Sequence, residues 1–170
     1  MKVLTADNNP ETLDFLGEIL RKEGFTILTA ESGSEALAVY EKESPDFICL
    51  DIMMPDQNGY DVCREIRRSN TEIPIIFISS KSEPVDKILG LELGADDYIT
   101  KPFDIGEVMA RIRAVARRCI SRKKPETVNE SFKMGPIEVF PNQLRAYKGE
   151  QVIDLSLREV KILTILYDKK

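Results

Sequence analysis

Histidine is missing from this sequence of 170 residues. Its absence excludes Ser-His-Asp and Cys-His catalysis, and it excludes any metal site that needs a histidine ligand. Cysteine is scarce and odd in number, because the sequence holds only Cys49, Cys63 and Cys119, which lie far apart. This pattern argues against a disulfide or zinc framework and predicts reduced, buried thiols.

Long apolar runs are missing as well. No stretch approaches the roughly 18 apolar residues that would suggest a membrane span. The N-terminus leads straight into a strand-like run from Val3 to Ala6, so we expect no signal peptide. Together with the unpaired cysteines, these features predict a cytoplasmic protein that makes no membrane contact.

Charge is distributed unevenly along the chain. Residues 1–120 hold 14 basic and 22 acidic side chains, whereas residues 121–170 hold 10 basic and 7 acidic ones. An acidic module followed by a mildly basic one suggests two separate roles. The basic excess is too small to indicate nucleic-acid binding by itself.

A short apolar run from Phe47 to Leu50 is followed directly by an acid, Asp51. Pro45 and Pro55 bound this stretch, and an apolar run of this length is typical of a strand buried on both faces. Asp51 would then emerge at the carboxyl edge of a sheet. In open α/β sheets, that edge is where ligands bind.

Strand-like and helical patterns alternate through residues 1–120. The strand-like segments are residues 2–6, 25–30, 46–50, 74–79 and 97–100, and each is followed by a helical pattern. Helix starts are marked by Asn9-Pro10, by the Ser32–Glu35 capping box and by Asp104 with Glu107. This alternation predicts an α/β fold: a five-stranded, parallel, doubly wound (flavodoxin-like) sheet with helices on both faces.

The last fifty residues differ in kind. Residues 121–131 are polar and charged and are predicted to be a linker. Four short strands follow, at residues 132–134, 137–140, 144–148 and 151–154, and a capping box at Ser156 and Glu159 opens one amphipathic helix. We therefore expect domains at residues 1–120 and 132–170. A small four-stranded antiparallel sheet with one helix is a poor core, so we expect the second domain to be incomplete.

Four chemically useful side chains each follow a different predicted strand. They are Asp7, Asp51, Ser79 and Lys101, and the predicted fold places them side by side. Two carboxylates, a hydroxyl and an ammonium around one cleft suit phosphoryl chemistry. Asp51 could be the nucleophile and, with Asp7, could hold Mg²⁺. Lys101 would neutralise one phosphoryl oxygen, and Ser79 would donate a hydrogen bond to another.

Three longer motifs resemble the response regulators of two-component systems, in particular the winged-helix (OmpR/PhoB-type) transcription regulators. The motifs are Asp-Ile-Met-Met-Pro at 51–55, Gly-Ala-Asp-Asp-Tyr-Ile-Thr-Lys-Pro-Phe at 94–103, and Leu-Ser-Leu-Arg-Glu-Val-Lys-Ile-Leu at 155–163. The resemblance covers residues 1–119 as a receiver domain and 132–170 as the N-terminal part of a winged-helix effector domain.

The resemblance implies a role for each matching residue. Asp51 would be the phosphoacceptor for a sensor histidine kinase, and Lys101 the phosphoryl-binding lysine, followed by a cis proline at Pro102. Ser79 and Tyr98 would be the switch residues. Mg²⁺ would be held by Asp7, Asp51 and the backbone carbonyl of Met53. Such a protein is not an enzyme with a separate substrate, although it would be capable of catalysing its own phosphoryl transfer and slow dephosphorylation.

One position departs from the family pattern. The family usually carries two acids after the first strand, whereas this chain has Ala6 and Asp7. Asp7 stands where the direct metal ligand belongs, and the acid replaced by Ala6 usually reaches the metal through water. We expect weaker magnesium binding. The same departure leaves open an atypical receiver that acts as a phosphorylation-independent dimerisation module.

The resemblance also implies a homodimer through the fourth helix, fifth strand and fifth helix. Its predicted charged surface consists of Lys87, Glu92, Asp96, Asp97, Glu107, Arg111, Arg113 and Arg118. Opposite charges can pair across a two-fold axis, and Lys87–Glu107 and Asp97–Arg111 are the expected pairs.

Two further alternatives involve phosphoryl transfer without a transcriptional role: a phosphorelay carrier or a small phosphatase. A phosphatase of the haloacid-dehalogenase kind needs an acid two residues after its nucleophile, where this chain has Met53. DNA would be a partner only if the chain continues past Lys170, because the family's recognition helix and wing follow the helix that starts near Ser156.

Overall fold

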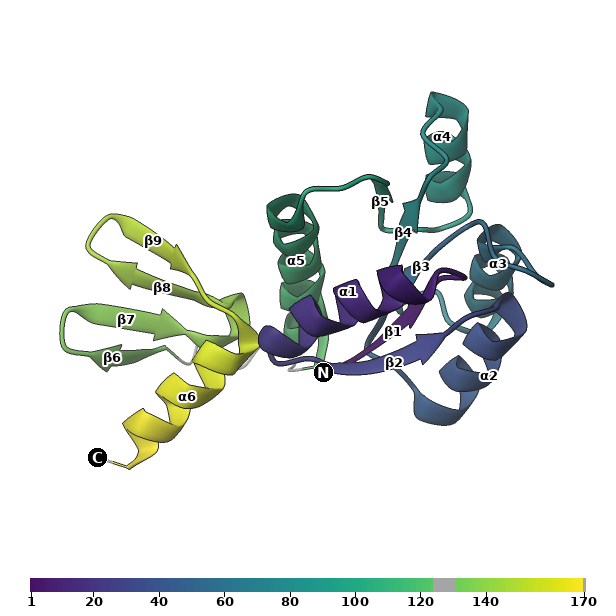
Figure 1. The fold of residues 1–170 in the computed structure, drawn as a ribbon. Coiled ribbons are helices and arrows are strands. Elements are labelled where there is room, and N and C mark those ends of the chain that lie inside the picture. The colour runs from purple at the N-terminus through teal and green to yellow at the C-terminus, as the bar shows by residue number, and fades with distance from the viewer. Residues whose placement is uncertain (124–130, 170) are drawn as a thin grey trace.

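The computed structural model describes residues 1–123 and 131–169, and its N-terminal part is a five-stranded parallel sheet (Figure 1). The strand order is β2-β1-β3-β4-β5. The strands are β1 (Lys2–Ala6), β2 (Thr26–Ala30), β3 (Phe47–Leu50), β4 (Ile75–Ser79) and β5 (Asp97–Thr100). Every residue of β3 and β4 is buried, as expected for central strands covered on both faces.

Five helices surround this sheet. They are α1 (Pro10–Lys22), α2 (Gly33–Glu43), α3 (Gly59–Ser69), α4 (Pro84–Glu92) and α5 (Ile105–Lys123). Figure 1 shows α1 and α5 on one side of the sheet and α2 and α3 on the other, with α4 standing beside β5. Two apolar clusters fill the two sides, so the doubly wound, flavodoxin-like prediction is confirmed.

The helix starts follow the capping chemistry of the sequence. The Asn9 side chain accepts a hydrogen bond from the Glu11 amide, and Ser32 accepts one from the Glu35 amide. The Glu35 carboxylate accepts a hydrogen bond from the Glu31 amide at 2.8 Å. One of the two hydrogen bonds of the expected Ser32–Glu35 capping box is therefore present, and the other goes to the residue before Ser32. These caps satisfy amide groups that the helices leave without partners.

The C-terminal part is an antiparallel sheet followed by one helix. Its strand order is β6-β7-β8-β9, and the chain then enters α6. The elements are β6 (Phe132–Met134), β7 (Ile137–Phe140), the 3₁₀ turn η1 (Pro141–Gln143), β8 (Arg145–Lys148), β9 (Gln151–Asp154) and α6 (Leu157–Asp168). Leu144 was expected to open the third of these strands. It has a left-handed backbone (φ 51°), so β8 begins one residue later.

The boundary between the two parts differs from the predicted linker. Helix α5 continues to Lys123, so residues 121–123 are helical. Residues 124–130 of the predicted linker lie outside the described residues. Ser131 is described and donates a hydrogen bond to Glu138 at 2.7 Å.

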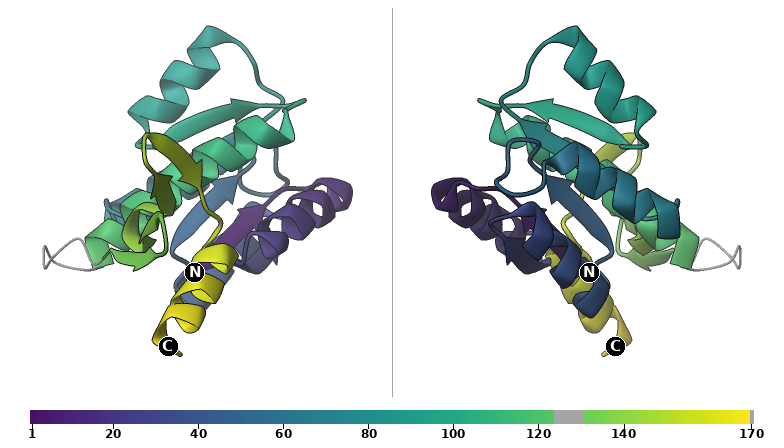
Figure 2. Two further views of the ribbon diagram at one scale, coloured as in Figure 1. Left: turned by 90° about the vertical axis from the view of Figure 1, so that its left-hand side faces the viewer. Right: turned by 90° about the vertical axis from the view of Figure 1, so that its right-hand side faces the viewer.

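The two parts share one apolar core. Val139, Leu144 and Ala146 belong to the same cluster as Ile112 and Ala116 of α5. Figures 1 and 2 show α6 starting beside the C-terminal end of α1. The small sheet thus packs against α5. It does not have to form a core alone, for which a sheet of this size would be poorly suited.

A polar contact reinforces this junction at the end of α1. The Glu23 carboxylate pairs with Arg113 of α5 at 2.9 and 3.1 Å, and the Glu23 carbonyl accepts a hydrogen bond from the Arg158 amide at 3.1 Å. Gly24 has a φ of 94°, and a Cβ there would come within 2.9 Å of the Arg158 nitrogen. Glycine is therefore required at this close approach. Among the described residues, no helix combines the length and apolar character needed to cross a membrane.

Candidate functional site

An acidic cluster lies at the carboxyl edge of the parallel sheet. The Lys101 ammonium is 2.6 Å from Asp7 Oδ2 and 2.9 Å from Asp51 Oδ2. Asp7 and Asp51 are 2 % and 3 % exposed, whereas about a fifth of the Lys101 side chain reaches solvent. Three residues that each follow a different strand therefore meet at one point, as the sequence pattern predicted.

The electrostatics of this cluster keep Lys101 charged. Burial acts to lower the pKa of Lys101, but the hydrogen bonds and negative charges of Asp7 and Asp51 outweigh burial and raise it above its usual value. An ammonium fixed between two carboxylates is a ready partner for the oxygens of an incoming phosphoryl group.

Backbone amides hold the other oxygen of Asp51. Asp51 Oδ1 accepts hydrogen bonds from the Ile52 amide at 2.6 Å and from the Met53 amide at 3.3 Å. The Asp51 amide itself donates to the Ala6 carbonyl at 2.8 Å. The carboxylate is thereby positioned by main-chain groups, with its second oxygen turned toward Lys101.

The predicted switch residues share one backbone partner. The Lys81 amide lies 3.4 Å from Ser79 Oγ, and the Tyr98 hydroxyl donates to the Lys81 carbonyl at 2.8 Å. Ser79 is fully buried, and Tyr98 is 8 % exposed. Tyr98 is therefore turned inward, and it lies against Phe77 with ring centroids 6.0 Å apart.

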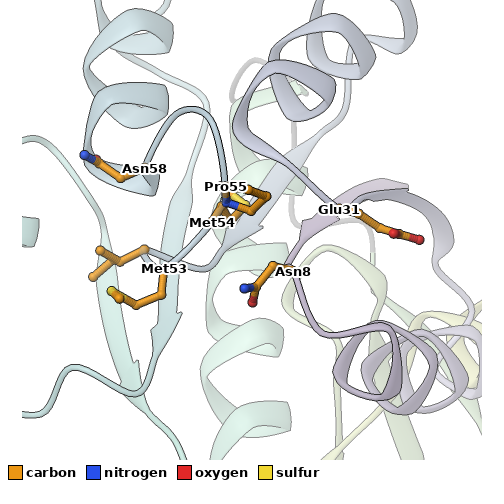
Figure 3. A pocket seen from close by; sticks show the side chains of 7 residues that line it. Asn8, Glu31, Met53, Met54, Pro55 and Asn58 are labelled. Atoms are coloured by element: carbon orange, nitrogen blue, oxygen red, sulfur yellow. The ribbon is translucent and has the colours of Figure 1, made fainter.

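A groove of about 580 Å³ adjoins Asp51 (Figure 3). Its walls come from the residues that follow the first three strands: Asn8, Glu31 and the stretch from Ile52 to Pro55, with Asn58. Figure 3 shows Asn8 between Met53 and Glu31, with the Glu31 carboxylate pointing away from Met53. The Met53 side chain is 52 % exposed at this edge.

The donor atoms at this edge suit a hard cation but are few. Asp7 and Asp51 supply carboxylate oxygens, which Mg²⁺ prefers. Within residues 1–123 and 131–169, no group of three histidine, cysteine, aspartate or glutamate side chains could hold a metal ion. Ala6 is 1 % exposed and lies in the apolar cluster with Leu4 and Ala30, so it offers no oxygen atom. Magnesium would therefore depend on two carboxylates, main-chain carbonyls and water.

The cysteines are buried, as predicted. Cys49, Cys63 and Cys119 are all free thiols. Burial raises the pKa of the Cys49 thiol to about 12, so Cys49 stays protonated and unreactive at neutral pH.

The residues of the predicted dimer surface make ion pairs within one chain. Arg111 contacts both Asp97 and Glu107 at 2.9 Å, and Asp96 contacts Arg67 at 3.3 Å and Arg118 at 3.7 Å. The expected Asp97–Arg111 pair therefore forms inside the subunit, and its intersubunit form stays a prediction that requires an exchange of partners. Lys87 and Glu92 lie on α4.

Arg113 corrects the predicted surface. It was grouped with Arg111 and Arg118, but the structure places it on the side of α5 that faces α1, where it pairs with Glu23. The physical reason is helical geometry. A spacing of two residues turns side chains to nearly opposite faces, whereas the spacing of seven between Arg111 and Arg118 returns to the same face.

Some neighbours of this site were not found from the sequence. Lys81, Tyr60 and Asp86 surround the segment between β4 and α4, and Asn8 and Glu31 line the groove. Asn8 could have been inferred, because it follows Asp7 at a strand end. Nothing in the sequence distinguishes Tyr60 from an ordinary core aromatic.

Comparisons with known proteins agree with this geometry. The family model described as response regulator receiver domain matches residues 3–113. The alkaline phosphatase synthesis transcriptional regulatory protein PhoP of Bacillus subtilis is 38 % identical over 170 residues, which cover 97 % of this chain and 71 % of that protein.

Solved structures of receiver domains are similar to about two thirds of this chain. The BeF₃-activated receiver domain of Klebsiella pneumoniae RstA is 32 % identical, with a TM-score of 0.65, over 67 % of this chain and 97 % of that one. A chain of the CheX-CheY-BeF₃-Mg²⁺ complex of Borrelia burgdorferi is 31 % identical, with a TM-score of 0.65, over 68 % of this chain and 88 % of that one.

Proposed function

Because this chain belongs to the response regulator receiver family, we propose that Asp51 accepts a phosphoryl group from a sensor histidine kinase and so regulates transcription. The observation that carries this proposal is the cluster of Asp7, Asp51 and Lys101, in which a buried nucleophile lies 2.9 Å from a fixed ammonium. The similarity to PhoP supports the transcriptional role.

In the proposed reaction, a carboxylate oxygen of Asp51 forms a bond to phosphorus while the bond from phosphorus to the kinase's histidine nitrogen breaks. The electron pair of the broken bond stays on that nitrogen, which then takes up a proton. Lys101 pairs with a phosphoryl oxygen, and the hydroxyl of Ser79 donates a hydrogen bond to another. The chain changes its own covalent state, so we do not propose an enzyme that turns over a separate substrate.

Magnesium fits this site as a cofactor. Asp7, Asp51 and the Met53 carbonyl would hold the ion, and it would neutralise charge on the phosphoryl oxygens. The related Borrelia complex contains both Mg²⁺ and BeF₃. The residues of this chain supply oxygen donors of the kind that Mg²⁺ prefers. Their number is reduced, because Ala6 replaces one acid of the family's usual pair.

Intact mass spectrometry tests the proposal. The chain should gain the mass of one phosphoryl group when it is incubated with magnesium and a small phosphodonor such as acetyl phosphate. A sample with the metal chelated is the control and should gain little. A chain whose mass does not change in either sample would refute phosphoryl acceptance.

Restoring the missing acid should strengthen the magnesium site. Ala6→Asp places a carboxylate beside Asp7, and added negative charge favours a divalent cation, so the dissociation constant for Mg²⁺ should fall by about tenfold, the order of effect of one nearby charge. Titration of the ion by calorimetry measures this change. Ala36→Asp is unsuitable as a control because Ala36 is fully buried in α2. Ser34→Asp, on the exposed first turn of α2, should leave the affinity unchanged.

We further propose that phosphorylation favours a homodimer through α4, β5 and α5. Four exposed apolar side chains on α4 support this surface: Val85, Ile88, Leu89 and Leu91. Buried apolar area is the usual driving force for association, and the neighbouring charged residues would set register. We propose DNA as a partner only if the chain continues past Lys170. The proposed location is the cytoplasm.

Charge reversal at Arg111 tests the dimer. Arg111→Glu should weaken dimerisation by about five- to tenfold, because it places an acid beside Asp97 and Glu107 where a cation now holds both. Sedimentation equilibrium with and without BeF₃⁻ measures this effect. Adding Asp97→Arg should restore part of the affinity. Arg145→Glu, whose side chain lies in the C-terminal sheet, is the matched control and should have no effect.

A phosphorylation-independent dimerisation module is the second candidate, and the apolar burial of Ala6 favours it. The same sedimentation series separates the two candidates. A dimer that is equally strong with and without BeF₃⁻ supports the module, and a dimer that strengthens with BeF₃⁻ supports the phosphorylation switch. The phosphatase alternative has no support in the site, because Met53 stands where a second acid would be needed.

A further inference from the structure

Three side chains contact one another around the segment between β4 and α4, next to the predicted switch. Tyr60 lies in the first turn of α3, Lys81 lies two residues after β4, and Asp86 lies in the first turn of α4. The Tyr60 hydroxyl is 3.3 Å from the Asp86 carbonyl and 3.4 Å from Asp86 Oδ1. The Lys81 ammonium is 3.3 Å from the same Oδ1. Asp86 thus accepts from α3, through Tyr60, and from the segment between β4 and α4, through Lys81.

The ring of Tyr60 makes two further contacts. The Lys81 ammonium lies 5.7 Å from the centre of the Tyr60 ring, a distance at which the ring face attracts a cation. The ring also packs edge-on against Phe77, with centroids 5.5 Å apart at 76°. Tyr60 therefore contacts both the side chain of Lys81 and the ring of Phe77. Phe77 in turn lies against Tyr98.

The backbone of Lys81 is the shared partner of the two switch residues. Its amide faces Ser79 Oγ, and its carbonyl accepts the Tyr98 hydroxyl. Any movement of residue 81 must therefore change the surroundings of both Ser79 and Tyr98. The side chain of Lys81 is anchored only by Asp86 and Tyr60 among the interactions of the described residues.

We propose that Tyr60 is a positioning residue of the switch: acting through Asp86 and Lys81, it fixes the segment between β4 and α4 in the arrangement that holds Tyr98 inward. This inference rests on the proposed function, since Tyr98 matters to signalling only if Asp51 is the phosphoacceptor. It adds α3 to the elements that set the switch equilibrium.

The protonation of Tyr60 fits this role. Burial, followed by the electrostatic influence of the nearby Tyr98 phenol and Asp86 carboxylate, raises the pKa of Tyr60 well above its usual value. The hydroxyl therefore remains a hydrogen-bond donor at neutral pH.

Fluorine NMR of the chain labelled with 3-fluorotyrosine tests the proposal. The sequence holds five tyrosines, and Tyr98→Phe identifies the Tyr98 signal. Tyr60→Phe keeps the ring and removes only the hydroxyl. It should shift the Tyr98 signal toward the position of solvent-exposed fluorotyrosine. In BeF₃⁻ and magnesium, it should also reduce the association constant of the dimer by about five- to tenfold, the effect of one lost hydrogen bond.

Tyr40→Phe is the matched control, because Tyr40 is also a half-buried tyrosine but lies in α2. It should leave the Tyr98 signal unchanged. A Tyr98 signal that is the same in Tyr60→Phe, in Tyr40→Phe and in the wild type would overturn the proposal.

Lys81→Met provides a second variant if Tyr60→Phe does not fold. Its side chain is 39 % exposed, so the substitution should leave the core intact while it removes both the ion pair with Asp86 and the contact with the Tyr60 ring. It should shift the Tyr98 signal in the same direction, and no shift would count against the proposal. The NMR signal is read without phosphodonor, so it tests Tyr60 even if Asp51 takes up no phosphoryl group.

Discussion

Asp51→Asn should take up no phosphoryl group under conditions in which the wild type gains one. An amide is a far weaker nucleophile than a carboxylate, and the covalent intermediate requires that carboxylate. The fold should survive, because the asparagine side-chain oxygen can keep the hydrogen bonds from the Ile52 and Met53 amides, and Lys101 keeps its pair with Asp7. Intact mass spectrometry after incubation with acetyl phosphate and magnesium gives the result directly.

A matched acid serves as the control for this experiment. Asp56 lies in the same loop, but its carboxylate binds the amides of Gly33 and Ser34 at the start of α2. The hydrogen bond from the Ser34 hydroxyl, followed by those from the Gln57, Ser34 and Gly33 amides, holds the pKa of Asp56 below its usual value. Asp56→Asn should therefore still accept one phosphoryl group. Phosphorylation of Asp51→Asn at the wild-type level would show that another side chain is the acceptor.

Gly59→Ala should destabilise the fold by about 3 kcal/mol, because overpacking against backbone atoms cannot be relieved by a side-chain rotation. A Cβ at Gly59 would overlap the carbonyl oxygen of Asp51 and lie 2.9 Å from the Cα of Ile52. Gly59 is the first residue of α3, and its amide donates to the Ile52 carbonyl. The midpoint of thermal unfolding should fall by roughly 6–12 °C.

Gly17→Ala is the comparison that isolates the backbone clash. Gly17 lies inside α1, and a Cβ there would meet only the flexible end of the Arg21 side chain. Alanine favours a helix interior, so this variant should be neutral or more stable by up to about 1 kcal/mol. Equal unfolding midpoints for the two variants would mean that the loop after Asp51 can move away from α3.

Much of the receiver could be predicted from sequence because its strands are short apolar runs with a polar residue at the end. The runs before Asp51 and Ser79 are fully buried strands, and Asp7, Asp51 and Lys101 meet as parallel topology requires. The cis peptide at Pro102, which the family resemblance implied, is present in the structure. These features follow from local pattern and from the rule that parallel strands share an edge.

The remaining features depend on packing between distant segments, which leaves no periodic signal. Arg113 was assigned to the wrong face because its partner, Glu23, is 90 residues away. The Asp97–Arg111 pair could form within or between subunits on charge alone, and only the geometry shows the internal one. Tyr60 resembles any half-buried aromatic until Asp86 is placed beside its hydroxyl.

Helix α5 carries contacts toward both ends of the molecule. Arg111 binds Asp97 on the proposed dimer surface, and two residues later Arg113 binds Glu23, whose carbonyl holds the first turn of α6. A helix cannot turn one of these arginines without moving the other. Suppose that dimerisation changes the equilibrium constant for packing of the C-terminal part against the receiver. That packing must then change the dimer affinity by the same factor, because coupling free energies are reciprocal. Under that condition, a ligand that binds only the C-terminal part and alters its packing would change the affinity of the dimer at the proposed surface.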